Sequence, residues 1–136
     1  MREHFQLLLP DEVVAWAELA LTPGDPDRIA ATVRDMQRRR KEAQPSGVRT
    51  FGSVWKNPSA DLTAGRLLEQ AGLKGYQVGG ARISPVHANF IENVGEARSS
   101  DIIALMAEAR RRARERGIDL EHEVQMVGPI WLPPDA

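Results

Sequence analysis

The sequence predicts an α+β fold in which a two-layer mixed sheet of short strands packs with about three helices. Two long segments, about 26–42 and 99–116, carry apolar residues at helical spacing behind residue types that favour helix N-termini. Short runs rich in β-branched and aromatic residues lie between glycines and prolines, which is typical of strands. Long helices mixed with several short strands favour two packed layers.

The N-terminal third is predicted to hold one strand and one helix. Residues 12–21 (EVVAWAELAL) alternate in places and are rich in Val, Trp and Leu, which indicates a strand. Asp25 followed by Pro26 is typical of a helix N-terminus, and the apolar spacing predicts a helix from about Pro26 to Glu42. Residues 48–62 are polar, contain glycine and proline and fit neither period, so we expect a loop there.

The rest of the chain is predicted to alternate short helices and strands. A helix is expected from about Thr63, which would cap it, to a left-handed stop at Gly72. A longer helix is expected to be capped by Ser99 or Ser100 and to end at Gly117. The strands expected in this part of the chain are short and cover residues 75–84, 88–94 and 120–127.

Composition excludes several classes of function. The chain has 136 residues, enough for the core of one domain, and its lack of cysteine excludes disulfides, thiolate nucleophiles and Cys-based zinc sites. A net charge of -1 gives no global field for nucleic acid or an anionic membrane, and no apolar run approaches the length needed to cross a bilayer. The histidines form no zinc motif, so no metal is expected. We therefore expect a cytoplasmic protein with neither nucleic-acid nor membrane partners.

Two local basic runs interrupt this neutral balance. Arg38–Lys41 is the first, and Arg110–Arg112, followed by Arg114 and Arg116, is the second. Acids lie close to both runs, and cations are favoured near helix C-termini, so solvated helix ends are the expected interpretation of the second run. The first run stands just before the most informative loop, and a role in ligand binding stays open for it.

That loop, Gly52–Pro58 (GSVWKNP), combines residue types suited to a polar ligand. Gly52 would let the backbone approach a ligand closely, and Ser53 offers a hydroxyl beside it. Lys56 and Asn57 add a cation and an amide that both donates and accepts, which suits phosphates and sugars. On composition alone, a surface turn explains the same residues.

The same seven residues closely resemble the GSVFKNP signature of the UDP-N-acetylenolpyruvoylglucosamine reductases, also called UDP-N-acetylmuramate dehydrogenases (the MurB family). The resemblance continues in order through segments 64–69, 71–75 and 87–91. It closes at Leu120–Gly128 (LEHEVQMVG), which resembles the family's LEPEVRIIG. The motifs lie at family-like spacing over roughly residues 12–128, and they imply the fold of the family's C-terminal, substrate-binding domain.

The resemblance implies an oxidoreductase of peptidoglycan synthesis, and hence a part in cell-wall biogenesis, cell shape and division. Family members use FAD and NADPH to reduce UDP-GlcNAc-enolpyruvate to UDP-N-acetylmuramate. Ser53 would take the role of the proton donor, and Glu123 would help to stabilise the intermediate. Arg2 lies at about the distance of the family's other catalytic arginine, although its surroundings match that motif poorly. Without the resemblance, Glu123 is a solvent-facing strand acid.

Substrate-binding residues follow from the resemblance in the same way. Asn57 matches an asparagine that contacts the nucleotide diphosphate, and Lys56 lies beside it. Arg40 stands at the spacing of a substrate-holding arginine, or is one more arginine on a basic helix end. The sequence departs from the family at Gln125, where many relatives have arginine, and at Trp55, which replaces the commoner phenylalanine.

By the same resemblance, residues 1–22 are the tail of a flavin-binding region, residues 23–128 the substrate-binding domain, and residues 129–136 a disordered or frayed tail. The family's glycine-rich flavin-binding loops are not in this sequence, so the expected partner is a flavin-binding domain in cis or in trans. We expect neither FAD nor NADPH on this chain alone, and no turnover by it. A non-catalytic nucleotide-sugar-binding remnant or regulatory module is the alternative, followed by a purely structural domain.

Overall fold

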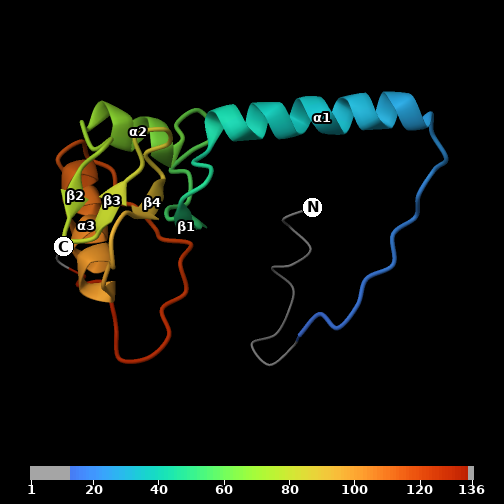
Figure 1. The fold of residues 1–136 in the computed structure, drawn as a ribbon. Helices are drawn as coiled ribbons and strands as arrows, with labels where there is room; N and C mark the ends of the chain where they lie inside the picture. Colours follow the sequence, from blue (N-terminus) through green and yellow to red (C-terminus); the bar gives the residue numbers. More distant parts are fainter. Residues whose placement is uncertain (1–12, 135–136) are drawn as a thin grey trace. The chain divides into compact units, whose positions relative to one another are not determined.

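The computed structural model of the chain describes residues 13–134; residues 1–12 and 135–136 lie outside the described part. The chain consists of two compact units, and the boundary between them lies between Val33 and Arg34. The elements in chain order are α1 (Pro26–Ala43), β1 (Arg49–Ser53), α2 (Ala64–Gln70), β2 (Gln77–Val78), β3 (Ala81–Ile83), β4 (Phe90–Asn93) and α3 (Ser99–Arg114) (Figure 1). No helix within the described part is both long and apolar enough to span a membrane.

The predicted α+β class is confirmed, with α2 and α3 as one layer and the sheet as the other. The sheet has the strand order β1-β4-β3-β2, and α3 packs against β2, β3 and α2 (Figure 1). Every strand pairing among the described residues is antiparallel. The prediction of a mixed sheet is therefore wrong. The core lies between the two layers and contains Leu67, Leu68, Leu73, Ile83, Leu105 and Met106.

The segment expected as one strand, residues 75–84, is a hairpin instead. Val78 pairs with Ala81, so β2 and β3 are joined by the two residues Gly79 and Gly80. Gly79 has a φ of 53°, which glycine adopts without a Cβ penalty. Gly80 packs against backbone, because a Cβ there would lie 2.0 Å from the oxygen of Gly95. The paired glycines are therefore a turn rather than the middle of a strand.

Three further strand predictions are wrong or incomplete. Residues 49–53 form β1 although a loop was expected. Their sequence has no alternation of apolar and polar residues, and the strand forms because its backbone pairs with β4. Residues 13–21 form no strand, and all are exposed, because no described segment pairs with them. The strand expected at 120–127 is reduced to one bridge between Trp55 and His122.

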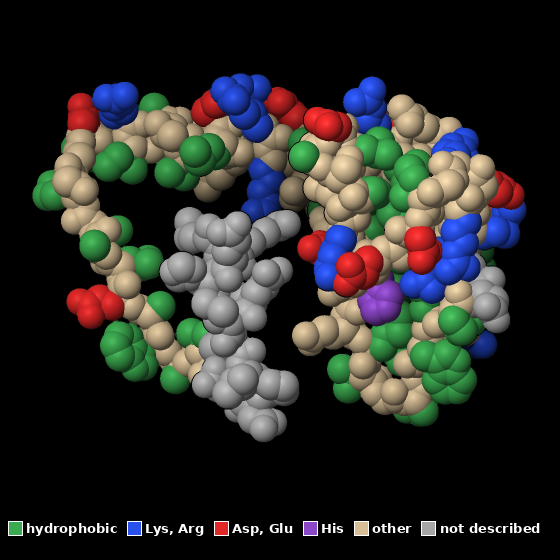
Figure 2. Space-filling view, turned by 180° about the vertical axis from the view of Figure 1, so that it is seen from behind, with side chains coloured by type: hydrophobic (Ala, Val, Ile, Leu, Met, Phe, Trp, Pro, Cys, Tyr) green, Lys and Arg blue, Asp and Glu red, His purple; other side chains and the backbone are tan. Residues whose placement is uncertain are grey.

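Helices α1 and α2 follow their predicted ends. The Asp25 side chain accepts the backbone N–H of Asp27 (2.9 Å), and the Thr63 hydroxyl accepts that of Arg66 (3.2 Å). Gly72 closes α2 in the left-handed conformation with a φ of 71°. No described side chain of α1 is buried, and Figure 2 shows most of its charged side chains along one side.

The cap of α3 differs from the prediction of Ser99 or Ser100. The carboxylate of Asp101 accepts the backbone N–H of Arg98 (3.0 Å) and that of Gly80 (3.2 Å). These bonds, first from Arg98 and then from Gly80, lower the pKa of Asp101 below its ordinary value. Asp101 is in the third helical position, and its carboxylate caps the helix by accepting the N–H of Arg98, the residue before the helix, in place of either serine. Its bond to Gly80 also connects the helix to the β2–β3 turn.

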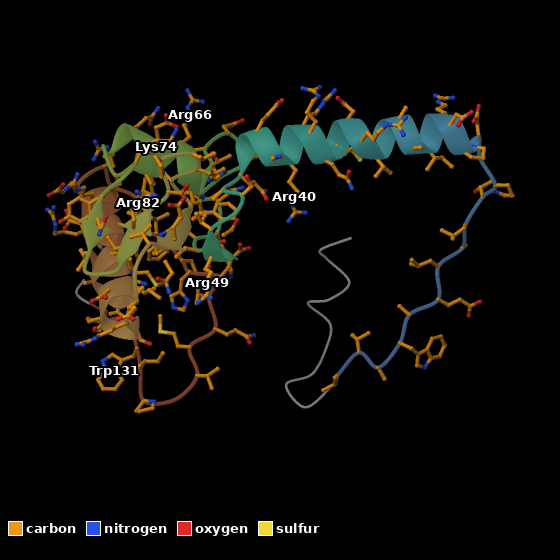
Figure 3. All side chains as sticks on the ribbon, viewed as in Figure 1. Arg40, Arg49, Arg66, Lys74, Arg82 and Trp131 are labelled. Atoms are coloured by element: carbon orange, nitrogen blue, oxygen red, sulfur yellow. The ribbon has the colours of Figure 1, made fainter. Side chains whose placement is uncertain are left out.

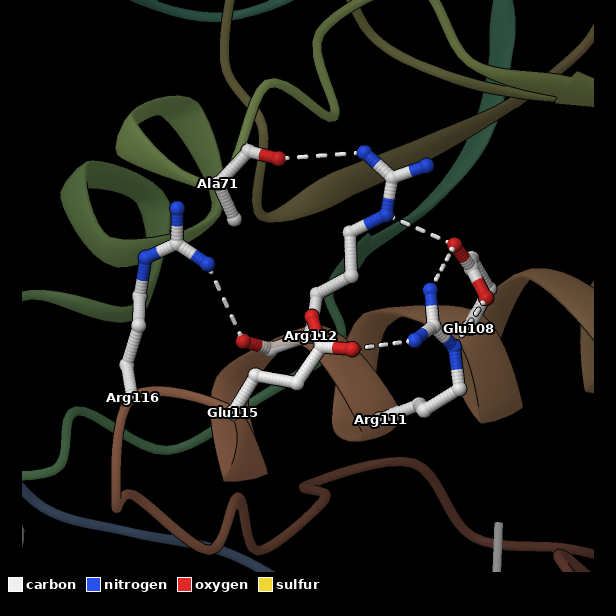
Figure 4. A network of polar contacts seen from close by, with 6 residues as sticks. All are labelled: Ala71, Glu108, Arg111, Arg112, Glu115 and Arg116. Carbon is white, nitrogen blue, oxygen red and sulfur yellow. Dashed lines mark hydrogen bonds and ion pairs between the residues drawn. The ribbon is translucent and has the colours of Figure 1, made fainter.

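The second basic run joins α3 to α2 (Figure 4). Arg112 donates to the Ala71 carbonyl (3.1 Å), and Arg116 donates to the Gln70 carbonyl (3.0 Å). These carbonyls lie at the C-terminus of α2, where helix geometry leaves them without intrahelical partners. Glu108 accepts hydrogen bonds from Arg111 (2.8 Å) and Arg112 (2.6 Å), and those bonds lower its pKa to about 2. Arg112 and Arg116 thus contact α2, whereas Arg111 pairs with Glu108 and Glu115 at the C-terminal end of α3 itself.

The Glu108 network predicts a loss of stability at acid pH. A carboxyl whose pKa is depressed to about 2 from 4.5 stabilises the fold above pH 4.5 and loses that contribution as pH falls toward 2. Glu108→Gln keeps the shape without the charge, so its deficit in unfolding free energy should shrink across this window in urea titrations. Glu69→Gln is the control, because it alters only an exposed ion pair with Lys74. A Glu108→Gln deficit that is constant with pH would contradict this account.

Candidate functional site

The segment that follows β1 is held in an extended conformation along both of its edges. On one edge, the Val54 N–H donates to the Asn89 carbonyl (2.9 Å). On the other, the Val54 carbonyl accepts the Glu123 N–H (2.8 Å), and the Lys56 N–H donates to the Glu121 carbonyl (2.8 Å). Val54 and Trp55 are buried, so the polar backbone of this segment is satisfied by protein groups rather than by water.

Gly52 sets the direction in which this segment leaves the sheet. Its φ is +88°, and nothing lies within 4 Å of a Cβ built there. The register of β1 against β4 also shifts between Thr50 and Ser53. The glycine is therefore required for the backbone conformation rather than for close contact with another group, and it lies at the register shift just before Ser53 pairs with Phe90.

Ser53 and Glu123 lie on the same cavity, as the predicted pair of reactive groups requires. The cavity has a volume of about 460 Å³ and is bounded by the end of β1, by α3 and by the segment 123–130. Its polar lining also includes Ser99 and Gln125, and its apolar lining consists of Ile102, Ile103, Met106, Val124, Met126 and Ile130. Both Ser53 and Glu123 are exposed, so a ligand could reach them.

Arg40 lines a second cavity of about 470 Å³, which also reaches the β1 end. Gln37, Arg40 and Lys41 come from the C-terminal half of α1, and Thr50 and Gly52 come from β1. Figure 3 shows Arg40 projecting from this part of the helix. Ser53 lines the first cavity and Gly52 the second, so consecutive residues of one strand serve both.

The cations of the first basic run differ in their partners. Arg38 and Arg39 both pair with Asp35 (2.6 and 2.7 Å), and Arg38 also bonds Glu42 (3.2 Å). Within the described residues, Arg40 and Lys41 form no ion pair. Unpaired cations that line a cavity favour an anionic ligand. The sequence left a binding role open for the whole run and singled out Arg40. The i, i+3 and i, i+4 spacing of Asp35 and Glu42 to Arg38 and Arg39 is the signal that separates these two residues from Arg40 and Lys41.

Lys56 and Asn57 are committed to contacts within the chain. The Lys56 ammonium group pairs with Glu121, and the Asn57 Oδ1 accepts the backbone N–H of Ala64 (3.1 Å) at the start of α2. Neither residue lines the cavity of Ser53 or that of Arg40. Arg2 lies outside the described residues. Sequence reasoning also missed Ser99, which shares the Ser53 cavity.

Comparisons with known proteins agree with the motifs. Residues 44–127 match the family model described as UDP-N-acetylenolpyruvoylglucosamine reductase, C-terminal domain. A UDP-N-acetylenolpyruvoylglucosamine reductase of Anaeromyxobacter dehalogenans (strain 2CP-C) is 49% identical over 129 residues, which are 94% of this chain and 38% of that protein. One from Nostoc punctiforme is 44% identical over 120 residues, 87% of this chain and 36% of that protein.

A solved structure gives the same relation in three dimensions. The crystal structure of UDP-N-acetylenolpyruvylglucosamine reductase from Thermus caldophilus matches with a TM-score of 0.58 and 40% identity, covering 71% of this chain and 34% of that one. The chain therefore spans well under half the length of the relatives that it matches.

Gly52 generates a test of the backbone that presents Ser53. Gly52→Ala should lower the unfolding free energy by about 1–2 kcal/mol, because an L-residue is strained at a φ of +88°. Gly95→Ala is the matched control: Gly95 has no positive φ and an equally open surrounding, so alanine should be neutral or stabilise by up to about 1 kcal/mol. Denaturant titrations of both variants measure the difference, and equal effects would contradict the role given to Gly52.

Proposed function

The chain belongs to the C-terminal domain family of the UDP-N-acetylenolpyruvoylglucosamine reductases, and we propose that it is the substrate-binding and proton-donating part of such a reductase. The proposed reaction is the FAD- and NADPH-dependent reduction of UDP-GlcNAc-enolpyruvate to UDP-N-acetylmuramate in peptidoglycan precursor synthesis. The shared cavity of Ser53 and Glu123 is the observation that carries this proposal. In the same scheme, residues 23–128 form the substrate-binding domain, and residues 1–22 belong to the flavin-binding region.

Proton delivery is the step assigned to Ser53. Hydride adds to one carbon of the enolpyruvyl double bond. The other carbon, which is bonded to the carboxylate, then carries enolate-like negative charge and must receive a proton. The Ser53 hydroxyl donates that proton. Glu123 lines the same cavity and helps to stabilise the intermediate. The apolar lining from Ile102 and Met106 lowers the local dielectric, which strengthens both contacts.

The nucleotide diphosphate is proposed to bind at the C-terminal end of α1. Arg40 and Lys41 have no ion-pair partner among the described residues and line a cavity with Gly52, whereas the charge of Lys56 is balanced by Glu121. Phosphates are favoured beside unpaired cations. Lys56 and Asn57 remain in the proposed binding surface, at its outer edge, with the Asn57 amide nitrogen as the available donor.

The cofactor is proposed to be held by a flavin-binding domain in cis or in trans. FAD reduced by NADPH supplies the hydride. The described charged residue that lines the Ser53 cavity is an acid, Glu123, which does not fit the anionic pyrophosphate of FAD. The apolar wall of Ile102, Ile103 and Met106 would fit the edge of a planar ring. This arrangement supports a chain that takes part in turnover only together with its flavin-binding partner.

Binding of a UDP-sugar to the 136-residue chain tests the recognition half of the proposal. With the flavin-binding side absent, we expect a Kd no tighter than about 0.1 mM, or about -5 kcal/mol. NMR shifts on adding UDP-GlcNAc should gather at residues 40–60 and near 123. Arg40→Gln should weaken binding about tenfold, whereas Arg39→Gln, whose cation already pairs with Asp35 (2.7 Å), should not. Shifts confined to residues 110–116 would refute this assignment.

Replacement of Ser53 tests the chemistry in a full-length reductase that carries this chain. Ser53→Ala should lower turnover by at least about a hundredfold, because general acid catalysis contributes roughly two to four orders of magnitude. Stopped-flow measurements should place the loss in reoxidation of the flavin by substrate, with reduction by NADPH unchanged. Glu123→Gln should show the same division between the two half-reactions.

Ser100→Ala is the matched control, since it removes an exposed hydroxyl that does not line the Ser53 cavity. Normal turnover after Ser53→Ala, or a loss confined to flavin reduction, would show that Ser53 is not the proton donor.

A further inference from the structure

The side chain of Asn89 pairs with a backbone segment as a neighbouring strand would. Its Oδ1 accepts the Trp55 N–H (2.9 Å), and its Nδ2 donates to the Trp55 carbonyl (2.9 Å). An asparagine amide carries the same donor and acceptor as a peptide group, so it can complete both bonds at once. Asn89 is 5% exposed and Trp55 is 2% exposed, so water does not compete for these bonds.

This pairing begins where the regular sheet ends. The β1–β4 register stops at the pair Ser53 and Phe90. Asn89 then contributes its carbonyl to the Val54 N–H (2.9 Å) and its side chain to both polar groups of Trp55. Asn89 thus continues the hydrogen bonding of the β1–β4 ladder to Val54 and Trp55, beyond the last paired residues of the two strands.

The opposite edge of the same segment carries the second reactive group. The Glu123 N–H donates to the Val54 carbonyl (2.8 Å), so the position of Val54 fixes that of Glu123. Ser53 is bonded covalently to the same residue. Whatever holds Val54 and Trp55 therefore sets Ser53 and Glu123 relative to each other across their cavity.

We propose that Asn89 is a positioning residue for proton delivery: its amide fixes the backbone of residues 54–55 and thereby keeps Ser53 and Glu123 in one reactive arrangement. The proposal rests on the function proposed above. Asn89 does not line the Ser53 cavity, so it acts through the backbone and not on the substrate.

Loss of the amide would leave two buried polar groups of Trp55 without partners. A buried donor or acceptor without a partner is costly, so the segment would shift toward water or admit it. A shift of about 1 Å in a reacting group can lower a rate by roughly a hundredfold. The effect should fall on the step that uses Ser53 and Glu123 together.

The test uses two asparagines of the same region in a full-length reductase that carries this chain. Asn89→Ala removes the bonds to Trp55. Asn93→Ala is the matched control, because the Asn93 Oδ1 also accepts two backbone N–H groups, those of Gly95 and Ala97 (both 3.2 Å), but away from the Ser53 cavity. Both variants should lose stability. Only Asn89→Ala should slow flavin reoxidation by substrate, by about tenfold or more, with reduction by NADPH unchanged.

Asn89→Asp separates positioning from simple destabilisation. Its protonated carboxyl can accept from the Trp55 N–H and donate to the Trp55 carbonyl, whereas the ionised form presents only acceptors. Burial favours the neutral form. Reoxidation by Asn89→Asp should therefore recover toward the wild-type rate as pH falls from about 8 to about 5. Rates are taken relative to wild type at each pH, because His87, whose Nδ1 accepts the Asn89 N–H (3.2 Å), is present in both.

The proposal is overturned by equal loss in both half-reactions after Asn89→Ala, or by an Asn89→Asp rate ratio that does not change with pH. The Ser53→Ala result is read separately. If Ser53→Ala slows reoxidation and Asn89→Ala does not, the proposed function stands and the role of Asn89 falls.

Discussion

The backbone of Val54–Lys56 is hydrogen-bonded along both edges, and the candidate site depends on it. One edge is completed by Asn89, through its carbonyl and its side-chain amide, and the other by the backbone of residues 121–123. Val54 and Trp55 are buried, so water molecules cannot replace these hydrogen bonds if they are lost. Two segments distant in sequence therefore meet on one short stretch, and that stretch carries the site.

Two basic runs of similar composition have different roles because their neighbours differ. In the run at the end of α3, Glu108 and the free carbonyls of α2 occupy Arg111, Arg112 and Arg116. In α1, Asp35 and Glu42 pair with Arg38 and Arg39. Arg40 and Lys41 line a cavity without an ion pair in the described part of the chain. A ligand anion is favoured where the protein has not already supplied a counter-charge.

Local rules predicted the helices well and the strands poorly. Caps at Asp25 and Thr63 and the left-handed Gly72 are set by neighbouring residues, and the structure has them. Strand β1 and the unpaired residues 13–21 are decided by whether a distant segment supplies hydrogen bonds, which no local pattern contains. The site shows the same division: Ser53 and Glu123 are indicated by motifs, whereas Ser99 joins the site only because α3 and β1 are assembled around one cavity.

The turn at Gly52 explains how one short strand can serve two cavities. A regular strand sends alternate side chains to opposite faces, and a residue at a φ of +88° breaks that alternation at the point where the ladder shifts register. The serine that follows is the last residue of β1 paired with β4, opposite Phe90, and the bonds to Val54 and Trp55 hold the backbone directly after it. A proton donor needs this combination, because its hydroxyl must face the ligand while the backbone beneath it stays fixed.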